Sequence, residues 1–158
     1  MSQSKRTNVS FYHLTKAPLE KALPKLLEKV VASKQRAVLM TGSPERTENL
    51  NTILWTYHPS SFLPHGSKKD GFPELQPIWL THEDQNPNGA KILVLVDGAQ
   101  SDHLKDYERC LDVFDGTNEQ AVKAARQRWK SYKDSGHSVT YWQQNDQGAW
   151  ESKASDQK

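Results

Sequence analysis

Hydrophobic positions recur along the chain with two different periods, and the changes of period predict where strands and helices begin. Residues 9–14 combine aromatic and β-branched side chains, which favours a strand. The next stretch repeats apolar residues with the spacing of one helix face: Leu19, Ala22, Leu23, Leu26, Leu27, Val30 and Val31. Pro24 falls inside this pattern, so we expect a kink or a separate first turn near the start of the helix.

A second strand and a second helix follow the first pair. The apolar run at residues 36–41, bounded by charge and glycine, predicts a strand buried on both faces. Residues 43–45 supply a helix cap, a proline and an acid for the first turn, and the helix should end near residues 57–58. The prolines and glycines of residues 60–77 predict a long irregular segment with one short extended piece.

The second half of the chain repeats this alternation. The Asn-Pro-Asn-Gly sequence at residues 86–89 is a strong turn signal between two apolar runs. The elements predicted here are strands at 77–81, 91–96, 109–114 and 138–142, a helical turn at 103–107 and a helix at 118–135.

Short, apolar, β-branched strands that alternate with helices predict an α/β fold. We expect a single domain over residues 1–143, with a Rossmann-like layered sheet that is largely parallel and has helices on both faces. Residues 1–7 should be flexible. Residues 144–158 should form a loose, polar C-terminal tail, in which Trp150 is the only large apolar side chain.

The composition narrows the classes of function. The 158 residues are 35% hydrophobic and 25% charged, and the mean hydropathy of −0.84 fits a hydrophilic folded domain. A net charge of +2 is too small for a protein that holds duplex DNA over its whole surface. The single cysteine, Cys110, cannot form an internal disulfide, and neither a leader nor an apolar run of membrane length occurs. We therefore expect a reduced, cytoplasmic protein without membrane contact.

Motifs for nucleotide binding, metal ligation and nucleophilic catalysis are missing from the sequence. Residues 42–44 lack the spaced glycines and the lysine of phosphate-binding loops, and Pro44 removes an amide donor. The six histidines show no i, i+4 pair. Asp97 follows a buried strand, where it either makes a turn with Gly98 or serves as a catalytic acid. We expect no catalytic residue, no cofactor and no metal. An enzyme built around Asp97 is kept as an alternative to the binding functions considered below.

The predicted helix at 118–135 carries two parallel rows of side chains. The apolar row is Val122, Ala125, Trp129 and Tyr132, and a basic row with the same spacing follows one residue later: Lys123, Arg126, Lys130 and Lys133. With Arg128 included, five cations and one acid give residues 121–135 a net charge of +4, twice that of the whole chain.

Three interpretations of this helix remain open. The apolar row can pack against a core while the cations are merely solvated. Alternatively, the cations can hold an acidic partner, which would offset the repulsion between like charges on one helix face. Trp129, between Arg126 and Lys130, could equally stack a base of single-stranded nucleic acid.

A second candidate surface combines Trp55 with Phe62, Leu63 and Pro64. Trp55 lies off the apolar face of its predicted helix, and the other three residues interrupt a polar segment. Such apolar groups mark protein contacts when they are exposed. The alternative is that Trp55 and Phe62 pack against each other and cover the edge of the sheet.

Several blocks of this sequence resemble the chi-subunit family of bacterial DNA polymerase III holoenzymes. They occur in order over residues 8–150 and comprise Val9-Ser-Phe-Tyr-His-Leu14, Leu54-Trp55, Ser61-Phe-Leu-Pro-His-Gly66, Leu95-Val-Asp-Gly98, Ala125-Arg-Gln-Arg-Trp-Lys130 and Tyr141-Trp-Gln143. The resemblance implies a non-catalytic α/β protein of the clamp-loader assembly. In that family, the subunit links the replicase to the acidic C-terminal tail of the single-stranded-DNA-binding protein, so that DNA is contacted indirectly.

The resemblance also implies two binding surfaces. The residues expected to bind the acidic tail are Lys123, Arg126, Trp129, Lys130 and Lys133. Trp129 stands where some family members have Tyr, and Lys123 would have to replace a family lysine whose position is occupied by Val122 here.

For the clamp-loader side, an aromatic pair of the family aligns with Trp55 and Phe62, and Leu63 and Pro64 lie next to it. The expected partner of this surface is the psi subunit or an equivalent loader protein, and a helicase could share it. Direct binding of single-stranded nucleic acid by the basic helix is the alternative function.

Overall fold

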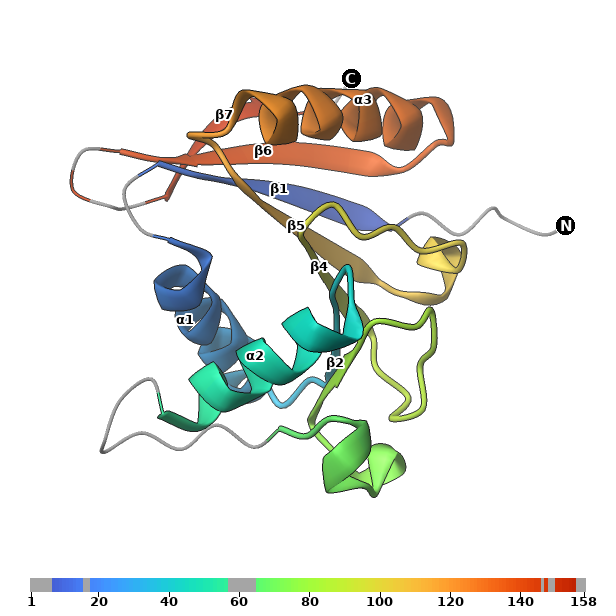
Figure 1. Cartoon of the computed structure of the whole chain (residues 1–158). Coiled ribbons are helices and arrows are strands. Elements are labelled where there is room, and N and C mark those ends of the chain that lie inside the picture. The colour runs from blue at the N-terminus through green and yellow to red at the C-terminus, as the bar shows by residue number, and fades with distance from the viewer. Residues whose placement is uncertain (1–6, 16–17, 57–64, 146, 148–149, 156–158) are drawn as a thin grey trace, which may run out of the picture.

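Seven strands form one sheet in the order β3-β2-β4-β5-β1-β6-β7 (Figure 1). The structure is a computed structural model that describes residues 7–15, 18–56, 65–145, 147 and 150–155. The strands are β1 (Asn8–Leu14), β2 (Ala37–Met40), β3 (Ile78–Thr81), β4 (Ile92–Val96), β5 (Arg109–Asp115), β6 (Ser138–Gln144) and β7 (Trp150–Ser155). The α-helices are α1 (Leu19–Ala32), α2 (Pro44–Thr56) and α3 (Glu119–Asp134), and three short 3-10 helices span Lys68–Asp70, Pro73–Leu75 and Leu104–Asp106.

The first six strands are parallel, which confirms the predicted α/β fold. β1 lies inside the sheet and pairs with β5 on one side and β6 on the other. β2, β3 and β4 are buried along their whole length, because helices or loops cover both faces of a parallel sheet.

The helices lie on opposite faces of the sheet (Figure 1). The apolar side chains of α1 and α2 share one hydrophobic cluster, whereas Ala125 of α3 belongs to a second one. β4 contributes to both clusters in strict alternation. Ile92, Val94 and Val96 face α1 and α2, and Leu93 and Leu95 face the side of α3. The sheet therefore separates two cores, each with its own helices.

The structure excludes one of the two alternatives for Pro24 and corrects the expectation for the tail. α1 runs as one helix through the buried Pro24, so no separate first turn forms. The tail beyond Gln143 is not loose throughout, because β7 pairs antiparallel with β6. Trp150 at the start of β7 stands edge-on to Tyr12, with ring centroids 5.0 Å apart, and this contact with the core holds an otherwise polar strand on the sheet.

Within the part of the chain that the structure describes, no helix has both the length and the apolar character needed to cross a membrane.

Candidate functional site

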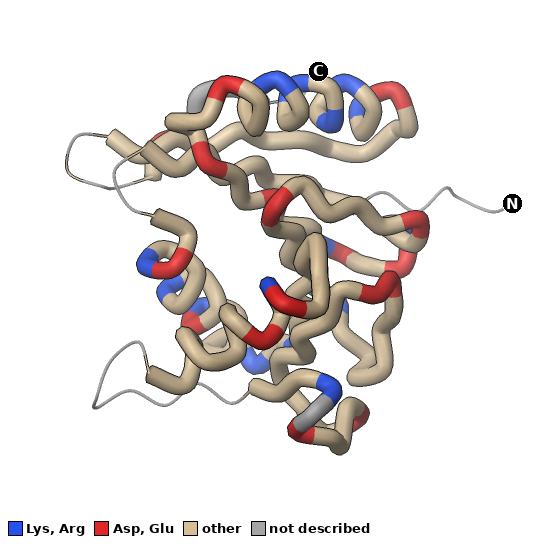
Figure 2. Tube along the Cα trace, in the orientation of Figure 1, with Lys and Arg blue, Asp and Glu red and all other residues tan. Residues whose placement is uncertain are grey.

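The basic row predicted from the sequence lies on one flank of α3. Asn118 caps this helix by accepting a hydrogen bond from the amide of Ala121 at 3.1 Å. Lys123, Arg126, Lys130 and Lys133 are all exposed. Figure 2 shows basic positions all along α3, with acidic residues near the two ends of the helix. The helix thus presents four positive charges on a surface about three turns long.

The apolar row of α3 packs against the sheet. Ala125 is buried, and Val122, Trp129 and Tyr132 are half-buried against the core. The ring of Trp129 lies 5.7 Å from that of Phe11 and 5.8 Å from that of Tyr141. Trp129 is therefore a packing residue with one accessible part beside the basic row.

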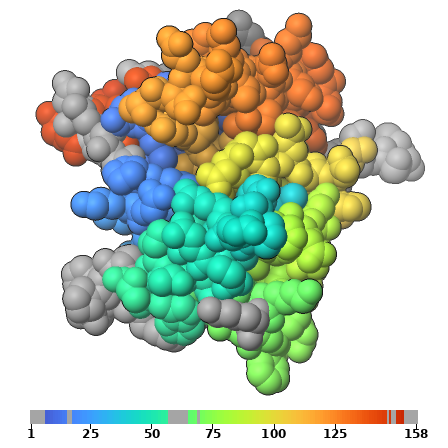
Figure 3. Space-filling view, viewed as in Figure 1, coloured from blue at the N-terminus to red at the C-terminus, as the bar shows by residue number. Residues whose placement is uncertain are grey.

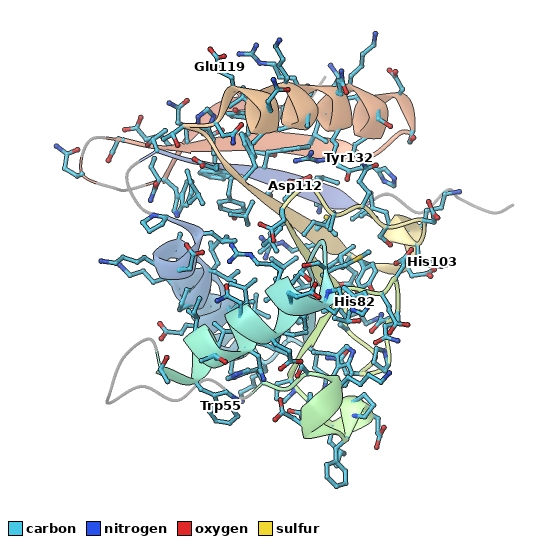
Figure 4. The ribbon with its side chains drawn as sticks, viewed as in Figure 1. Trp55, His82, His103, Asp112, Glu119 and Tyr132 are labelled. Atoms are coloured by element: carbon cyan, nitrogen blue, oxygen red, sulfur yellow. The ribbon has the colours of Figure 1, made fainter. Side chains whose placement is uncertain are left out.

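Arg128 does not belong to the exposed positive surface, which corrects the charge assigned to this helix from its sequence. Its guanidinium donates from Nε to Asp112 Oδ2 at 2.7 Å and from Nη2 to Asp112 Oδ1 at 2.9 Å. Arg128 is 6% exposed and Asp112 is 1% exposed. Asp112 lies on β5 in the layer between the sheet and α3 (Figure 4). This ion pair ties the helix to the sheet and leaves four cations, not five, facing solvent.

A polar pair beside the basic flank was not singled out from the sequence. The Tyr141 hydroxyl on β6 and His13 Nδ1 on β1 are hydrogen-bonded at 2.5 Å, and both residues are half-buried. Burial lowers the pKa of His13, and the positive charge of Arg126 lowers it further. Burial raises the pKa of Tyr141, while Arg126 acts in the opposite direction.

The strand pattern did contain a signal for this pair. His13 follows Phe11 by two residues and Tyr141 follows Val139 by two, so both should face the side of the sheet that α3 covers. The alternation alone could not show that the two side chains meet, because that depends on the pairing of β1 with β6.

The His13 ring is held tightly against Gly116, and this gives a testable prediction. A methyl group at position 116 would lie 1.8 Å from His13 Cδ2 and 2.6 Å from the backbone oxygen of Leu14. We expect Gly116→Ala to lower the free energy of unfolding by about 1–3 kcal/mol, because the backbone contact cannot relax by a rotamer change alone.

Gly42→Ala is the matched control in urea unfolding. Its methyl group would sit 3.7 Å from Asp97, which is ordinary contact. The expected change is about 0.5 kcal/mol or less. Equal stability of the two variants would show that His13 and the backbone at Leu14 can move to accommodate the added methyl group at little cost.

The second candidate surface is described only in part. Trp55, near the end of α2 (Figure 4), is 49% exposed, and its ring is tilted against that of His65 with ring centroids 4.5 Å apart. Phe62, Leu63 and Pro64 lie outside the described residues. Phe72 and Leu75, not singled out from the sequence, are 66% and 64% exposed. Their only signal was the occurrence of large apolar residues in a proline-rich irregular segment.

A cavity lies elsewhere in the molecule. It measures about 740 Å³ and lies at the carboxyl ends of β1 and β5, whose connections leave toward opposite faces of the sheet. Its walls come from α1 and α2 on one side and from the first turns of α3 on the other. Figure 3 shows the side chains of α3 along the upper margin of this face, above those of α1 and α2. None of the five residues expected to bind an acidic tail lines this cavity.

Asp97 lies at the rim of this cavity and makes a turn with Gly98, which was one of the two interpretations of this residue. Asp97 and Gly98 have φ angles of 57° and 77°, and the amide of Ala99 donates to the carbonyl of Val96 at 3.0 Å. Arg46 Nε donates to the Asp97 carboxylate at 2.9 Å, and its Nη1 also reaches Glu20 at 3.0 Å. The Asp97 carboxylate thus takes part in a link between the strand end and the two helices on that face.

Two comparisons with known proteins agree with each other. The family model described as "DNA polymerase III chi subunit, HolC" matches residues 7–140. A protein of Rickettsia prowazekii (strain Madrid E), named "Probable DNA polymerase III subunit chi", is 38% identical over 105 residues. The aligned part is 66% of this chain and 64% of that relative, so the chain spans somewhat less than two thirds of the relative's length.

Proposed function

Because the chain belongs to the DNA polymerase III chi subunit family, we propose that it is an accessory subunit of the replicative polymerase whose α3 binds an acidic protein tail. The proposed ligand is the C-terminal tail of the single-stranded-DNA-binding protein. The observation that carries this proposal is the flank of α3, where four exposed cations border the half-buried Trp129. Within the described residues, Lys123, Arg126 and Lys130 form no ion pair with an acidic side chain.

Each part of this flank suits one feature of such a tail. The Arg126 guanidinium can hold a carboxylate through two parallel hydrogen bonds. Lys123, Lys130 and Lys133 add a positive field for further acids along the peptide. The accessible part of Trp129 offers an apolar contact for an aromatic side chain. The repulsion between Lys123, Arg126 and Lys130 is then relieved in the complex, because the tail supplies negative charge beside them.

We propose a different partner for the surface around Trp55. Trp55, together with Phe62, Leu63 and Pro64, would bind the psi subunit or an equivalent clamp-loader protein, as expected from the family. The 49% exposure of the Trp55 side chain supports this proposal. The protein would then act as a non-catalytic bridge in the cytoplasm, with DNA contacted through its partner.

The first test is a titration of the native tryptophan fluorescence with a short acidic peptide that ends in Pro-Phe. The same peptide without its final Phe is the control ligand. We expect saturable binding that requires the terminal Phe, because Trp129 and Arg126 would contact the ring and the carboxylate together. Absence of binding to both peptides would contradict the proposal.

The salt dependence of this binding is a separate prediction. Exposed charges are screened by salt, so raising NaCl from about 50 mM to about 500 mM should weaken peptide binding by about tenfold. A dissociation constant that stays the same over this range would rule out attraction by the cations of α3. It would also place the apolar contact with Trp129 as the main source of affinity.

Direct binding of single-stranded nucleic acid is the second candidate function, favoured by the position of Trp129 between cations. A base can stack on an accessible indole, and phosphates can pair with Arg126 and Lys130. Four cations, however, form a small surface for a polyanion. Oligo-dT in the same titration separates the two functions, since binding of oligo-dT without binding of the peptide would favour nucleic acid.

A further inference from the structure

The surface formed by the basic flank of α3 extends onto the sheet, where His13 and Tyr141 form a hydrogen-bonded pair beside it. We infer that His13 and Tyr141 form part of the same acidic-ligand site as Arg126, and that the ligand binds more tightly to the protein when His13 is protonated. This inference rests on the proposed function, since it concerns further residues of the proposed tail site.

Packing contacts connect the pair to the helix. Tyr141 contacts Trp129, with ring centroids 5.8 Å apart, and its hydroxyl is bonded to His13. Arg126 lies one turn before Trp129 on the same side of α3 as Lys130 and Lys133. His13, Tyr141 and Arg126 come from β1, β6 and α3, which are far apart in the sequence and meet only in the folded protein.

The floor beneath this group is aromatic. Phe114 lies 5.1 Å from the His13 ring and 6.0 Å from the Tyr141 ring, and Phe11 stacks on Tyr141 at 6.4 Å. The apolar floor limits the water around His13 and Tyr141, both of which are half-buried. A carboxylate held by Arg126 at this place would have a hydroxyl and an imidazole as further hydrogen-bond donors.

The titratable and charged groups that face His13 come from α3, β5 and β6. Arg126 of α3 opposes its protonation, whereas Asp115 at the end of β5 favours it. A backbone hydrogen bond with Gly116 also favours protonation, and Tyr141 of β6 is the direct partner of the ring. Of these, only Arg126 would be neutralised by a bound carboxylate.

The sign of the pH effect follows from this arrangement. In the free protein the pKa of His13 lies below its usual value of 6.5, so the ring is neutral at pH 7.5. A bound carboxylate cancels the field of Arg126 and attracts a proton to His13, so binding and protonation reinforce each other. Affinity should therefore rise as the pH falls below about 6.5, until the ligand's own carboxyl groups begin to protonate near pH 4 to 5.

The experiment is the titration with the acidic Pro-Phe peptide at about pH 7.5 and about pH 5.5. The unsubstituted protein should bind about fivefold more tightly at the lower pH, and His13→Asn should remove most of this difference. The control is His82→Asn, an exposed histidine after β3 at the far edge of the sheet, which should keep the full difference. An equal pH effect in His13→Asn, or none in the unsubstituted protein, would overturn the inference.

Two further measurements do not depend on that variant. The pKa of His13, followed by NMR of its ring protons, should rise when the peptide is added, and an unchanged value would overturn the inference. Tyr141→Phe keeps the aromatic packing and removes the hydroxyl, so binding should weaken about threefold at both pH values. Unchanged binding by this variant would exclude the hydroxyl from the site. Failure of the unsubstituted protein to bind the peptide at either pH would instead refute the proposed function itself.

Discussion

Asp112→Ala is expected to lower the free energy of unfolding by about 3–5 kcal/mol, the largest effect of any single substitution that we propose. Asp112 and Arg128 form a two-point ion pair that is almost closed to solvent. Removal of the carboxylate leaves the guanidinium buried without its counter-charge, and a buried unpaired charge costs far more than the pair itself contributes. Equilibrium unfolding in urea measures the loss directly.

Two controls separate this effect from a simple loss of packing. Asp134→Ala removes an exposed acid from the end of the same helix and should change the stability by about 0.5 kcal/mol or less. The double variant Asp112→Leu with Arg128→Met replaces the pair by apolar side chains and should recover most of the stability. A loss below about 1 kcal/mol in Asp112→Ala would mean that Arg128 reaches water when its partner is removed.

Arg126→Ala should weaken binding of the acidic Pro-Phe peptide by about tenfold or more, with the thermal unfolding of the protein almost unchanged. Arg126 is exposed, so its removal leaves no cavity and no buried charge. Arg126→Lys should retain part of the affinity, because a lysine keeps the charge but loses the two-point grip on a carboxylate.

Gln127→Ala is the matched control for this binding prediction. It removes an exposed, uncharged neighbour of Arg126 that also borders a small cavity with Arg128 and Tyr132, and it should leave peptide binding intact. A large fall in the melting temperature of Arg126→Ala would show that Arg126 supports the fold. Unchanged peptide affinity in Arg126→Ala would exclude it from the tail site.

The contrast between Arg126 and Arg128 shows how far the sequence alone could go. Their helical spacing already separated them, since Arg128 lies three residues after Ala125 and four before Tyr132, on the packed side. Asp112, the buried partner of Arg128, is sixteen residues away on a strand, and no local sequence pattern predicts that the two side chains pair. Local periodicity thus located the basic row, whereas only the tertiary structure determined which cation is neutralised.

The same limit explains the other differences. The apolar runs predicted the parallel strands well, because burial on both faces leaves a continuous hydrophobic signal. β7 carries almost no such signal, since its place depends on the exposed backbone of β6 and on one contact of Trp150 with Tyr12. His13 and Tyr141 were each inside a predicted strand, but their meeting depends on the order of strands in the sheet.

The separation of helices by the sheet has a consequence for simultaneous binding. Trp55 and Arg126 lie on helices that cover opposite faces, so a protein seated at one cannot sterically block the other. In the proposed bridge, two partners bound at these surfaces would be held on one rigid body, which would raise the local concentration of each partner around the other.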